Sequence, residues 1–306
     1  MSPEWDRRRE HEPMKFGFLA VNSAAGIGPG RLASEVEARG YESVWMPEHS
    51  HIPTNRRTPY PAGGELPDGY LHMMNPFVSL AAAVGTTSTL MLATGVCLAL
   101  EHDLLDLATT ASTLDAVSGG RFVMGIGAGW NAEELANHRP DLPFGRRYRA
   151  LEERVVALRT LWSDDPASFA GEFDGVEESW VYPKPVNGTI PIALGMAGDR
   201  GRPIAAALAD EWCPIDVEMH APDGRMSASA AIERFRGEVA DAGRDPASVP
   251  ITIFAMKPPR ADIVDKYAAL RVARVVFGPH EMTLHDADAT LRHLDALQPI
   301  VDANAL

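Results

Sequence analysis

The chain has 306 residues, of which 45% are hydrophobic and 23% are charged, a composition typical of a globular protein and unlike that of disordered or fibrous ones. Its 42 acidic and 28 basic residues give a net charge of −14, which repels phosphate backbones and anionic lipids. We therefore expect neither nucleic acid nor a membrane as a partner.

The first 13 residues are densely charged and lack the apolar core of a signal peptide, and no later segment approaches 18 uninterrupted apolar residues. These features predict a cytoplasmic protein. Because Met14 opens the first strand-like run, we expect residues 1–13 to be a mobile N-terminal extension and residues 14–306 to form a single domain. Cys97 and Cys213 lie in apolar stretches, which predicts buried, reduced thiols.

Short apolar runs rich in β-branched residues alternate with longer segments of helical period, as in parallel strands joined by crossover helices. The predicted strands are 15–21, 42–46, 91–97, 121–126, 190–195, 211–215, 250–255 and 272–277. The predicted helices are about 30–40, 76–87, 104–117, 148–162, 200–209, 228–242, 261–269 and 287–298. Eight strand–helix units of roughly 38 residues favour a (β/α)8 TIM barrel over two separate domains.

Two connections are longer than ordinary turns. Residues 48–75 follow the second strand, and residues 163–189 follow the helix after the fourth strand, where we expect a small hairpin. We regard both as insertions, after strands 2 and 4. Long loops of this kind usually build or cover a barrel's site.

In a parallel barrel the chemistry lies at the carboxyl ends of the strands, so the residues after each run are the candidates. After the second strand come Glu48, His49 and His51. They could be a carboxylate and a histidine that contact a ligand, a metal site in which the two histidines share one side of an extended segment, or a polar loop. We predict no metal, because a barrel metal site needs further His and Asp ligands at later strand ends and we find none there.

The fourth strand leads into the sequence GIGAGWN, residues 125–131. Glycines at every second position would let a ligand approach the backbone and leave amide groups free for it. The alternatives are a tight turn and a dinucleotide fingerprint, and the fingerprint fits poorly because Ala132 holds the third glycine position. The candidate cofactor contacts here are Gly127, Ala128, Gly129, Trp130 and Asn131.

The third and fifth strands end in small residues. Thr94, Gly95 and Val96 place a glycine inside a strand, which indicates a bulge, a close approach or relief of crowding in the barrel interior. After the fifth strand, small residues and two arginines, Arg200 and Arg202, precede a helix and suit a phosphate group, with capping by Asp199 as the alternative. The candidates in this segment are Gly195, Met196, Ala197, Gly198 and Arg200.

Together these stretches resemble the bacterial luciferase-like monooxygenase superfamily, and within it the flavin- or deazaflavin-dependent oxidoreductases. The resemblance covers about residues 14–215 in order, whereas the last third matches only in its strand–helix rhythm. The matching stretches are 40–45 (GYESVW) with Pro47-Glu48-His49, 94–96 (TGV), 112–115 (STLD), 118–121 (SGGR), 125–131 (GIGAGWN), Trp180 and 182–185 (YPKP).

The resemblance implies a flavin-type ring in the barrel mouth, backed by a non-prolyl cis peptide at Gly95-Val96. It also implies that Glu48 and His49 are catalytic, as in the acid–histidine pair of the deazaflavin-dependent sugar phosphate dehydrogenases. Trp130 departs from that pattern, because those dehydrogenases have a glutamate there. The whole resembles a subgroup that uses the deazaflavin coenzyme F420.

We therefore expect an oxidoreductase that transfers a hydride between coenzyme F420 and an unknown small organic substrate. The alternatives are an FMN-dependent monooxygenase and a non-catalytic flavin-binding protein. The substrate, the direction of transfer and the oligomeric state, with a homodimer among the options, stay open.

Overall fold

The computed structural model describes residues 14–216, 227–256, 261–279 and 286–304; the extension expected at residues 1–13 lies outside them. The strands are β1 (Lys15–Leu19), β2 (Ser43–Met46), β3 (Met91–Thr94), β4 (Phe122–Ile126), β5 (Ala167–Ala170), β6 (Gly175–Ser179), β7 (Ile192–Leu194), β8 (Glu211–Trp212), β9 (Thr252–Ala255) and β10 (Arg274–Phe277). The α-helices are α1 (Pro29–Ala38), α2 (Pro76–Val84), α3 (Leu104–Ser118), α4 (Ala132–His138), α5 (Arg147–Ser163), α6 (Arg202–Leu208), α7 (Ala228–Asp241), α8 (Ala261–Ala269) and α9 (Ala287–Asn304). The short 3-10 helices are η2 (Asp68–His72), η3 (Ala99–Glu101), η4 (Phe144–Arg146) and η5 (Pro246–Ser248).

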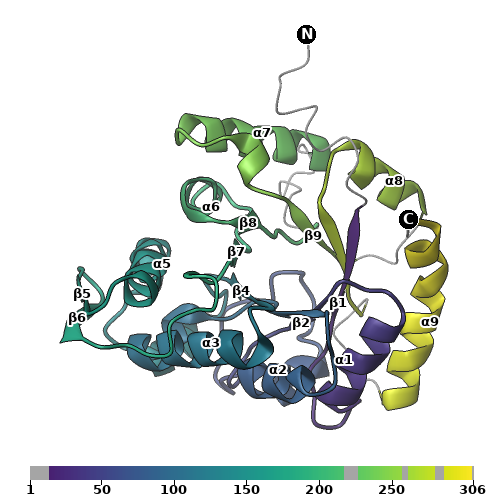
Figure 1. Ribbon diagram of the computed structural model, residues 1–306, viewed down its shortest axis with the longest axis horizontal. Coiled ribbons are helices and arrows are strands. Elements are labelled where there is room, and N and C mark those ends of the chain that lie inside the picture. The colour runs from purple at the N-terminus through teal and green to yellow at the C-terminus, as the bar shows by residue number, and fades with distance from the viewer. Residues whose placement is uncertain (1–13, 217–226, 257–260, 280–285, 305–306) are drawn as a thin grey trace.

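Eight parallel strands form the barrel in the order β8-β7-β4-β3-β2-β1-β10-β9. Two isolated parallel bridges, Trp212 to Ile251 and Ile215 to Phe254, connect β8 with β9 and bring the ends of the sheet together. The helices surround the strands, and the antiparallel β5–β6 hairpin lies outside α5 (Figure 1). The predicted (β/α)8 barrel and the predicted hairpin are therefore confirmed.

All eight predicted strands are present, although several are shorter than the apolar runs. Strand β8, predicted as residues 211–215, ends at Trp212, because Pro214 has no backbone N–H to continue the ladder. Helix α4, which has only seven residues, is not among the predicted helices, although Asn131 followed by two acidic residues is typical of a helix start. Helix α9 continues through Pro299 to Asn304, although the prediction ended before that proline. Within the described part of the chain, no helix is long and apolar enough to span a membrane.

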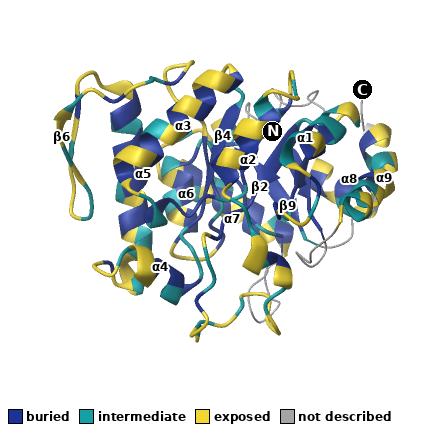
Figure 2. Cartoon of the chain, turned by 90° about the horizontal axis from the view of Figure 1, so that it is seen from below, coloured by how far each residue is buried: buried dark blue, intermediate teal, exposed yellow. Residues whose placement is uncertain are grey.

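The strands are buried on both faces. Outward-facing side chains pack against the helices, while one residue from each strand or its end fills the barrel interior. Figure 2 shows these buried residues at the centre of the molecule and the β5–β6 hairpin largely exposed at one side. Cys97 and Cys213 are buried and free, as predicted. The interior residues are Leu19, Trp45, Ala93, Val123, Ala193, Cys213, Phe254 and Val276.

An ion-pair cluster lies at the amino-terminal ends of the strands. The buried Arg274 guanidinium donates to both carboxylate oxygens of Glu42 at 2.8 and 2.9 Å, to Glu211 at 2.5 Å and to Thr252 Oγ1 at 3.0 Å. Its carbon Cζ also lies 5.7 Å from the centroid of the Trp45 ring. Burial alone would lower the pKa of Arg274, but Glu211 and Glu42 raise it, so the arginine stays charged. The cluster joins β10 to β8, to β9 and to the start of β2, and it closes this end of the barrel.

Replacing Arg274 with Met should lower the free energy of unfolding by about 3–5 kcal/mol, because the buried Glu211 would lose the cation that it contacts and Glu42 would keep only the half-exposed Lys15. Urea unfolding followed by circular dichroism measures the change. Lys15→Met is the control, since Lys15 is half-exposed and lies 3.8 Å from the same Glu42, and a loss below about 1 kcal/mol is expected there. Equal losses in the two variants would contradict a structural role for the buried cluster.

Candidate active site

The carboxyl ends of the barrel strands bring together most of the predicted site residues. Glu48 and His49 follow β2, Gly95 and Val96 follow β3, and residues 127–131 follow β4. Residues 195–198 follow β7, the neighbour of β4 in the sheet. The four segments therefore meet around one mouth, as the parallel barrel requires.

His49 is buried between two partners. Its Nδ1 lies 2.7 Å from Glu134 Oε2, and its Nε2 lies 3.2 Å from Trp130 Nε1. An indole N–H can only donate, so Nε2 accepts, and Nδ1 carries the hydrogen and donates to Glu134. Trp130 and Glu134 thus fix one tautomer, in which the Nε2 lone pair of His49 is held on the side of Trp130.

Glu48 faces a different part of the structure. Its Oε2 accepts from Leu98 N at 2.7 Å and its Oε1 lies 2.9 Å from His102 Nε2, both in the segment after β3. Burial tends to raise the pKa of Glu48, but His102, Leu98 and Cys97 outweigh it and hold the pKa below its usual value. The carboxylate ties the end of β2 to η3. These contacts are those of a positioning residue, and the catalytic role that the resemblance implies for Glu48 stays a prediction.

The predicted cis peptide is present between Gly95 and Val96. The Val96 side chain lies between the two neighbouring loops: a β-carbon built at Gly127 would be 2.6 Å from it, and one built at Gly195 would be 3.2 Å away. A β-carbon at Gly95 would lie 2.9 Å from Trp45 Cβ, so this glycine relieves crowding in the barrel interior. The bulge forms the centre of the mouth, with small residues on both sides.

The alternating glycines after β4 have a structural explanation that differs from the predicted one. At Gly125 a β-carbon would lie 2.0 Å from Thr94 O, so β3 and β4 can meet only because this residue has no side chain. Thr94 Oγ1 donates to Gly125 O at 2.7 Å and is fully buried. Gly129 has φ +70°, a left-handed conformation that favours glycine. The alternative of a tight strand-to-loop turn therefore accounts for the spacing, and ligand contact is not needed to explain it.

The long loop after β2 packs over the mouth. Tyr60 and Tyr70 lie edge-on to Trp130 with ring centroids 6.0 and 6.4 Å away, and Tyr70 is 5.2 Å from the His49 ring. The Arg56 guanidinium of the same loop lies over the Trp130 ring, with its Cζ 5.6 Å from the ring centroid. Three other titratable residues of the loop, Glu65, Asp68 and His72, are exposed. The aromatic side chains thus shield His49 from solvent on this side.

Glu133 fastens this loop to α4. Its carboxylate accepts from Arg57 N at 3.1 Å, from Thr58 N at 3.3 Å and from Thr58 Oγ1 at 2.7 Å. The Thr58 hydroxyl and the two backbone N–H groups lower the pKa of Glu133 to about 2. The attachment is therefore fully present above the ordinary glutamate value and is lost only as the pH falls through about 2.

The other residues predicted to contact the cofactor differ in burial and in whether they have a hydrogen-bonding group left for a ligand. Asn131 caps α4 through Oδ1, while its buried Nδ2 has no hydrogen-bond partner among the described residues. Met196 and Ala197 are buried and use their carbonyl oxygens within the protein, whereas Gly198 and Ala128 are more open to solvent. Asn131 is the polar group here whose unmet hydrogen bond suits a bound ring.

Of Arg200 and Arg202, only Arg200 is available to a ligand. Arg202, the first residue of α6, is buried and donates to Glu238, Asp199 and Ala197 O, so each nitrogen of its guanidinium is engaged within the protein. The predicted role of Arg202 in phosphate binding is wrong for this reason. Asp199 bonds Arg202 and does not cap the helix, which begins after Gly201 without a side-chain cap. Arg200 is exposed and has no ion pair within the described segments.

The structure adds Arg147, which sequence reasoning missed. Its Nε donates to Gly129 O at 3.1 Å, and its guanidinium packs on the rings of Phe144 and Tyr148. Burial, together with repulsion from Arg200, lowers the pKa of Arg147. A cation in the first turn of a helix opposes the helix dipole, so this position could have drawn attention in the sequence. Arg147 and Arg200 form a positive pair beside the β4 and β7 loops.

Metal ligation finds little support in the described side chains. Both ring nitrogens of His49 are hydrogen-bonded, and those of His51 contact Ser50 and Asn137. Ligand atoms of Glu48, Cys97 and His102 lie within 4.8 Å of one another. However, both Glu48 oxygens accept hydrogen bonds, and burial, followed by Glu48, raises the pKa of the Cys97 thiol well above its usual value. A protonated thiol is a poor ligand for a metal ion.

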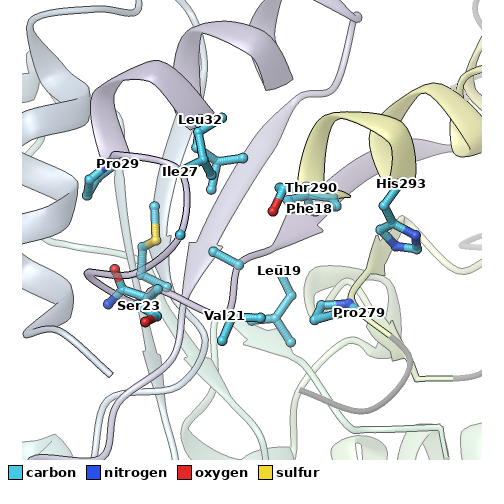
Figure 3. A pocket seen from close by; sticks show the side chains of 14 residues that line it. Phe18, Leu19, Val21, Ser23, Ile27, Pro29, Leu32, Pro279, Thr290 and His293 are labelled. Carbon is cyan, nitrogen blue, oxygen red and sulfur yellow. The ribbon is translucent and has the colours of Figure 1, made fainter. Parts of the chain in front are cut away.

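A small apolar cavity lies beside the mouth, between the end of β1, α1 and α9 (Figure 3). Phe18, Ile27 and Leu32 line it, with His293 at one side. Its volume is about 30 Å³, which fits a single water molecule and not an organic ring. We therefore place the candidate site at the barrel mouth around His49.

Replacing Glu133 with Gln should raise the rate of proteolytic cleavage within residues 51–75 about fivefold, the factor expected for the loss of roughly one net hydrogen bond. In the wild-type protein the rate should stay constant from about pH 8 to about pH 4, because Glu133 remains charged across that range. Glu152→Gln on α5 is the control. Cleavage unchanged in the Glu133 variant would show that the carboxylate does not hold the loop.

Comparisons with known proteins identify the family of the chain. The sequence profile of the luciferase-like monooxygenase family matches residues 26–298. An uncharacterised protein of Mycobacterium tuberculosis (strain ATCC 25618 / H37Rv) is 37% identical over 289 residues, which cover 92% of this chain and 98% of that protein. The F420-dependent glucose-6-phosphate dehydrogenase of Kineococcus radiotolerans is 28% identical over 195 residues, or 61% of this chain and 52% of that enzyme.

Among solved structures, an F420-dependent secondary alcohol dehydrogenase in complex with an F420-acetone adduct superposes with a TM-score of 0.74. It shares 16% sequence identity, and the alignment covers 96% of this chain and all of that one. This likeness establishes the barrel fold. Because the family profile matches most of the sequence, the chain belongs to the luciferase-like monooxygenase family.

Proposed function

We propose that this protein is an oxidoreductase that transfers a hydride between coenzyme F420 and a small organic substrate with a hydroxyl or carbonyl group. The observation that carries the proposal is the buried His49, held in one tautomer by Trp130 and Glu134 at the mouth of a luciferase-family barrel. The F420-dependent relatives support the choice of coenzyme. F420, when bound, would supply the hydride chemistry.

The residues of the mouth suit a ring with an anionic side chain. The bulge at Gly95-Val96, flanked by Gly127 and Gly195, offers a surface without bulky side chains, and Asn131 Nδ2 offers an unused donor. Arg147 and Arg200 would hold negatively charged groups. These groups bind and orient the coenzyme.

His49 is the group that would move a proton. Its Nε2 would accept the proton of a substrate hydroxyl, or return one to a carbonyl oxygen, after the substrate takes the place of Trp130 Nε1. Glu134 holds the imidazole in the required orientation through Nδ1. Tyr60 and Tyr70 keep water away from the reacting side of the ring. A buried histidine–carboxyl pair of this kind is more than coenzyme storage needs.

The alternative within the family is an FMN-dependent monooxygenase, and the coenzyme decides between the two. Fluorescence titration of the apoprotein should give at least tenfold tighter binding of F420 than of FMN, about 1.4 kcal/mol. Arg147→Gln and Arg200→Gln should each weaken F420 binding about fivefold through the loss of a charge-assisted hydrogen bond. Arg146→Gln, whose arginine pairs with Glu172, is the control and should bind normally. Equal or tighter binding of FMN would favour the monooxygenase.

His49→Gln should reduce the single-turnover rate of hydride transfer about 100-fold or more, because acid–base groups contribute two to four orders of magnitude. The dissociation constant of F420 should change less than about threefold, which separates chemistry from binding. His72→Gln, on the exposed part of the same loop, serves as control. A rate and an affinity both equal to those of the wild type would rule out a role for His49.

A further inference from the structure

Glu134 has a second oxygen that the proposed mechanism does not use. The Glu134 side chain is completely buried, and while Oε2 bonds His49, Oε1 has no hydrogen-bond partner within the described residues. A buried oxygen without a hydrogen bond lowers the stability of the folded protein, so its presence needs an explanation. His138 lies four residues later on α4, so its ring projects from the same face of the helix.

Glu101, at the end of η3, lies opposite this face of α4. Its side chain is 5% exposed, its Oε2 is 3.7 Å from His138 Nε2, and its Oε1 would be 3.8 Å from a β-carbon at Gly129. Oε2 also lacks a hydrogen-bond partner among the described residues. Glu101 thus sits between the loop after β4 and the surface histidine.

Glu101 carries a proton at neutral pH. Burial raises its pKa to about 9, with further contributions from the charges of Glu134 on α4 and Glu48 after β2. The other titratable group that faces it is His138, whose pKa burial and the nearby His51 lower. A protonated carboxyl next to a neutral imidazole can give up one proton and take another.

A polar pocket of about 460 Å³ lies on the outer side of Glu101 and His138, between η3, the start of α3, the end of α4, α5 and the β5–β6 hairpin. These elements lie on one side of the barrel in Figure 2. The other charged groups of the wall are occupied: Arg154 donates to both oxygens of Asp174, and Arg139 pairs with Asp141. Glu101 Oε2, by contrast, has no hydrogen-bond partner among the described residues, and His138 lies beside it at the edge of the pocket.

We propose that protons handled by His49 travel through Glu134 and Glu101 to His138 and this outer pocket, a route separate from the mouth through which coenzyme and substrate enter. The inference rests on the proposed acid–base role of His49. When Nε2 takes a proton from the substrate, the Nδ1–H bond breaks and an O–H bond forms on Glu134. Glu101 gives its proton to His138 Nε2 and receives the one from Glu134, and the Nδ1–H bond of His138 breaks to release a proton to water. One proton leaves for each one taken up, and reduction of a carbonyl reverses the sequence.

Helix α4 packs against η3, and the charge of Glu134 raises the pKa of Glu101, which places the two carboxyl groups near each other. Two further contacts support the transfer from Glu101 to His138. The 3.7 Å between Glu101 Oε2 and His138 Nε2 is closed by a rotation of the carboxyl or by one bridging water molecule. Ser50 Oγ lies 2.7 Å from His138 Nε2 and 2.8 Å from His51 Nδ1. Asn137 Nδ2 donates to His51 Nε2, so His51 Nδ1 carries a hydrogen and donates to Ser50 Oγ, and the Ser50 hydroxyl donates to His138 Nε2. His138 Nε2 therefore has no hydrogen of its own and can take one from Glu101.

The test uses the apoprotein and does not depend on catalysis. In protein with 15N-labelled histidine, NMR saturation transfer gives the exchange rate of the His49 Nδ1 hydrogen with water. Glu101→Gln, which keeps the shape of the neutral carboxyl but cannot pass a proton on, should slow this exchange at least tenfold, and so should His138→Gln. Asp103→Asn is the matched control, because it removes a charge from the same pocket and keeps the cap of α3. Its exchange rate should stay within about twofold of the wild type.

An unchanged exchange rate in Glu101→Gln would overturn the route, and so would an equal slowing in Asp103→Asn, which would indicate a general electrostatic effect. Slowed exchange in a protein that fails to react with F420 would leave the route standing and remove the proposed function.

A second measurement tests whether the Glu101 carboxyl is protonated. Because a raised carboxyl pKa costs stability between the ordinary value and about 9, Glu101→Gln should raise the unfolding midpoint at about pH 8 and leave it unchanged at about pH 4. The opposite pattern would show that Glu101 is ionised.

Discussion

The closure of the barrel at its amino-terminal end is the constraint on which the rest of the structure depends. Arg274 is buried among Glu42, Glu211 and Thr252, so one guanidinium connects β10 with β8, β9 and the start of β2. Above this cluster the Trp45 ring and the Phe254 ring meet edge to face, with centroids 5.1 Å apart. The lumen is therefore a filled core, and a ligand can reach the protein's chemistry only from the opposite end.

At that opposite end, backbone approaches set the shape of the mouth. Strands β3 and β4 come so close at Gly125 that no side chain fits, and Val96 occupies the space left by Gly127 and Gly195. The small residues thus permit the bulge, and the bulge in turn defines a surface with few side chains. The polar side chains near this surface, His49 and Asn131, come from the segments after β2 and β4, whereas the residues of the barrel interior below it are apolar.

Most of the fold could be predicted from the sequence, but fewer of the side-chain contacts at the candidate site could. Periodicity located every barrel strand, because buried parallel strands are continuous apolar runs, and the glycine within the third strand run indicated the irregularity at Gly95. It could not show that Arg202 is paired with Glu238, since that contact joins residues 36 positions apart. Glu134 and Glu101 escaped notice for a related reason. They come together only when the seven-residue helix α4 packs against η3. Asn131 and the acidic residues after it indicate the start of a helix, but they do not indicate its contact with η3.

Helix α4 carries two neighbouring carboxyl groups that reach in different directions. Glu133 holds the backbone of the loop at Arg57 and Thr58, and Glu134 holds the imidazole of His49. Both carboxyl groups belong to adjacent residues in the first turn of one short helix. The cover of the mouth and the histidine below it therefore share a single anchor, and the position of α4 sets the position of both.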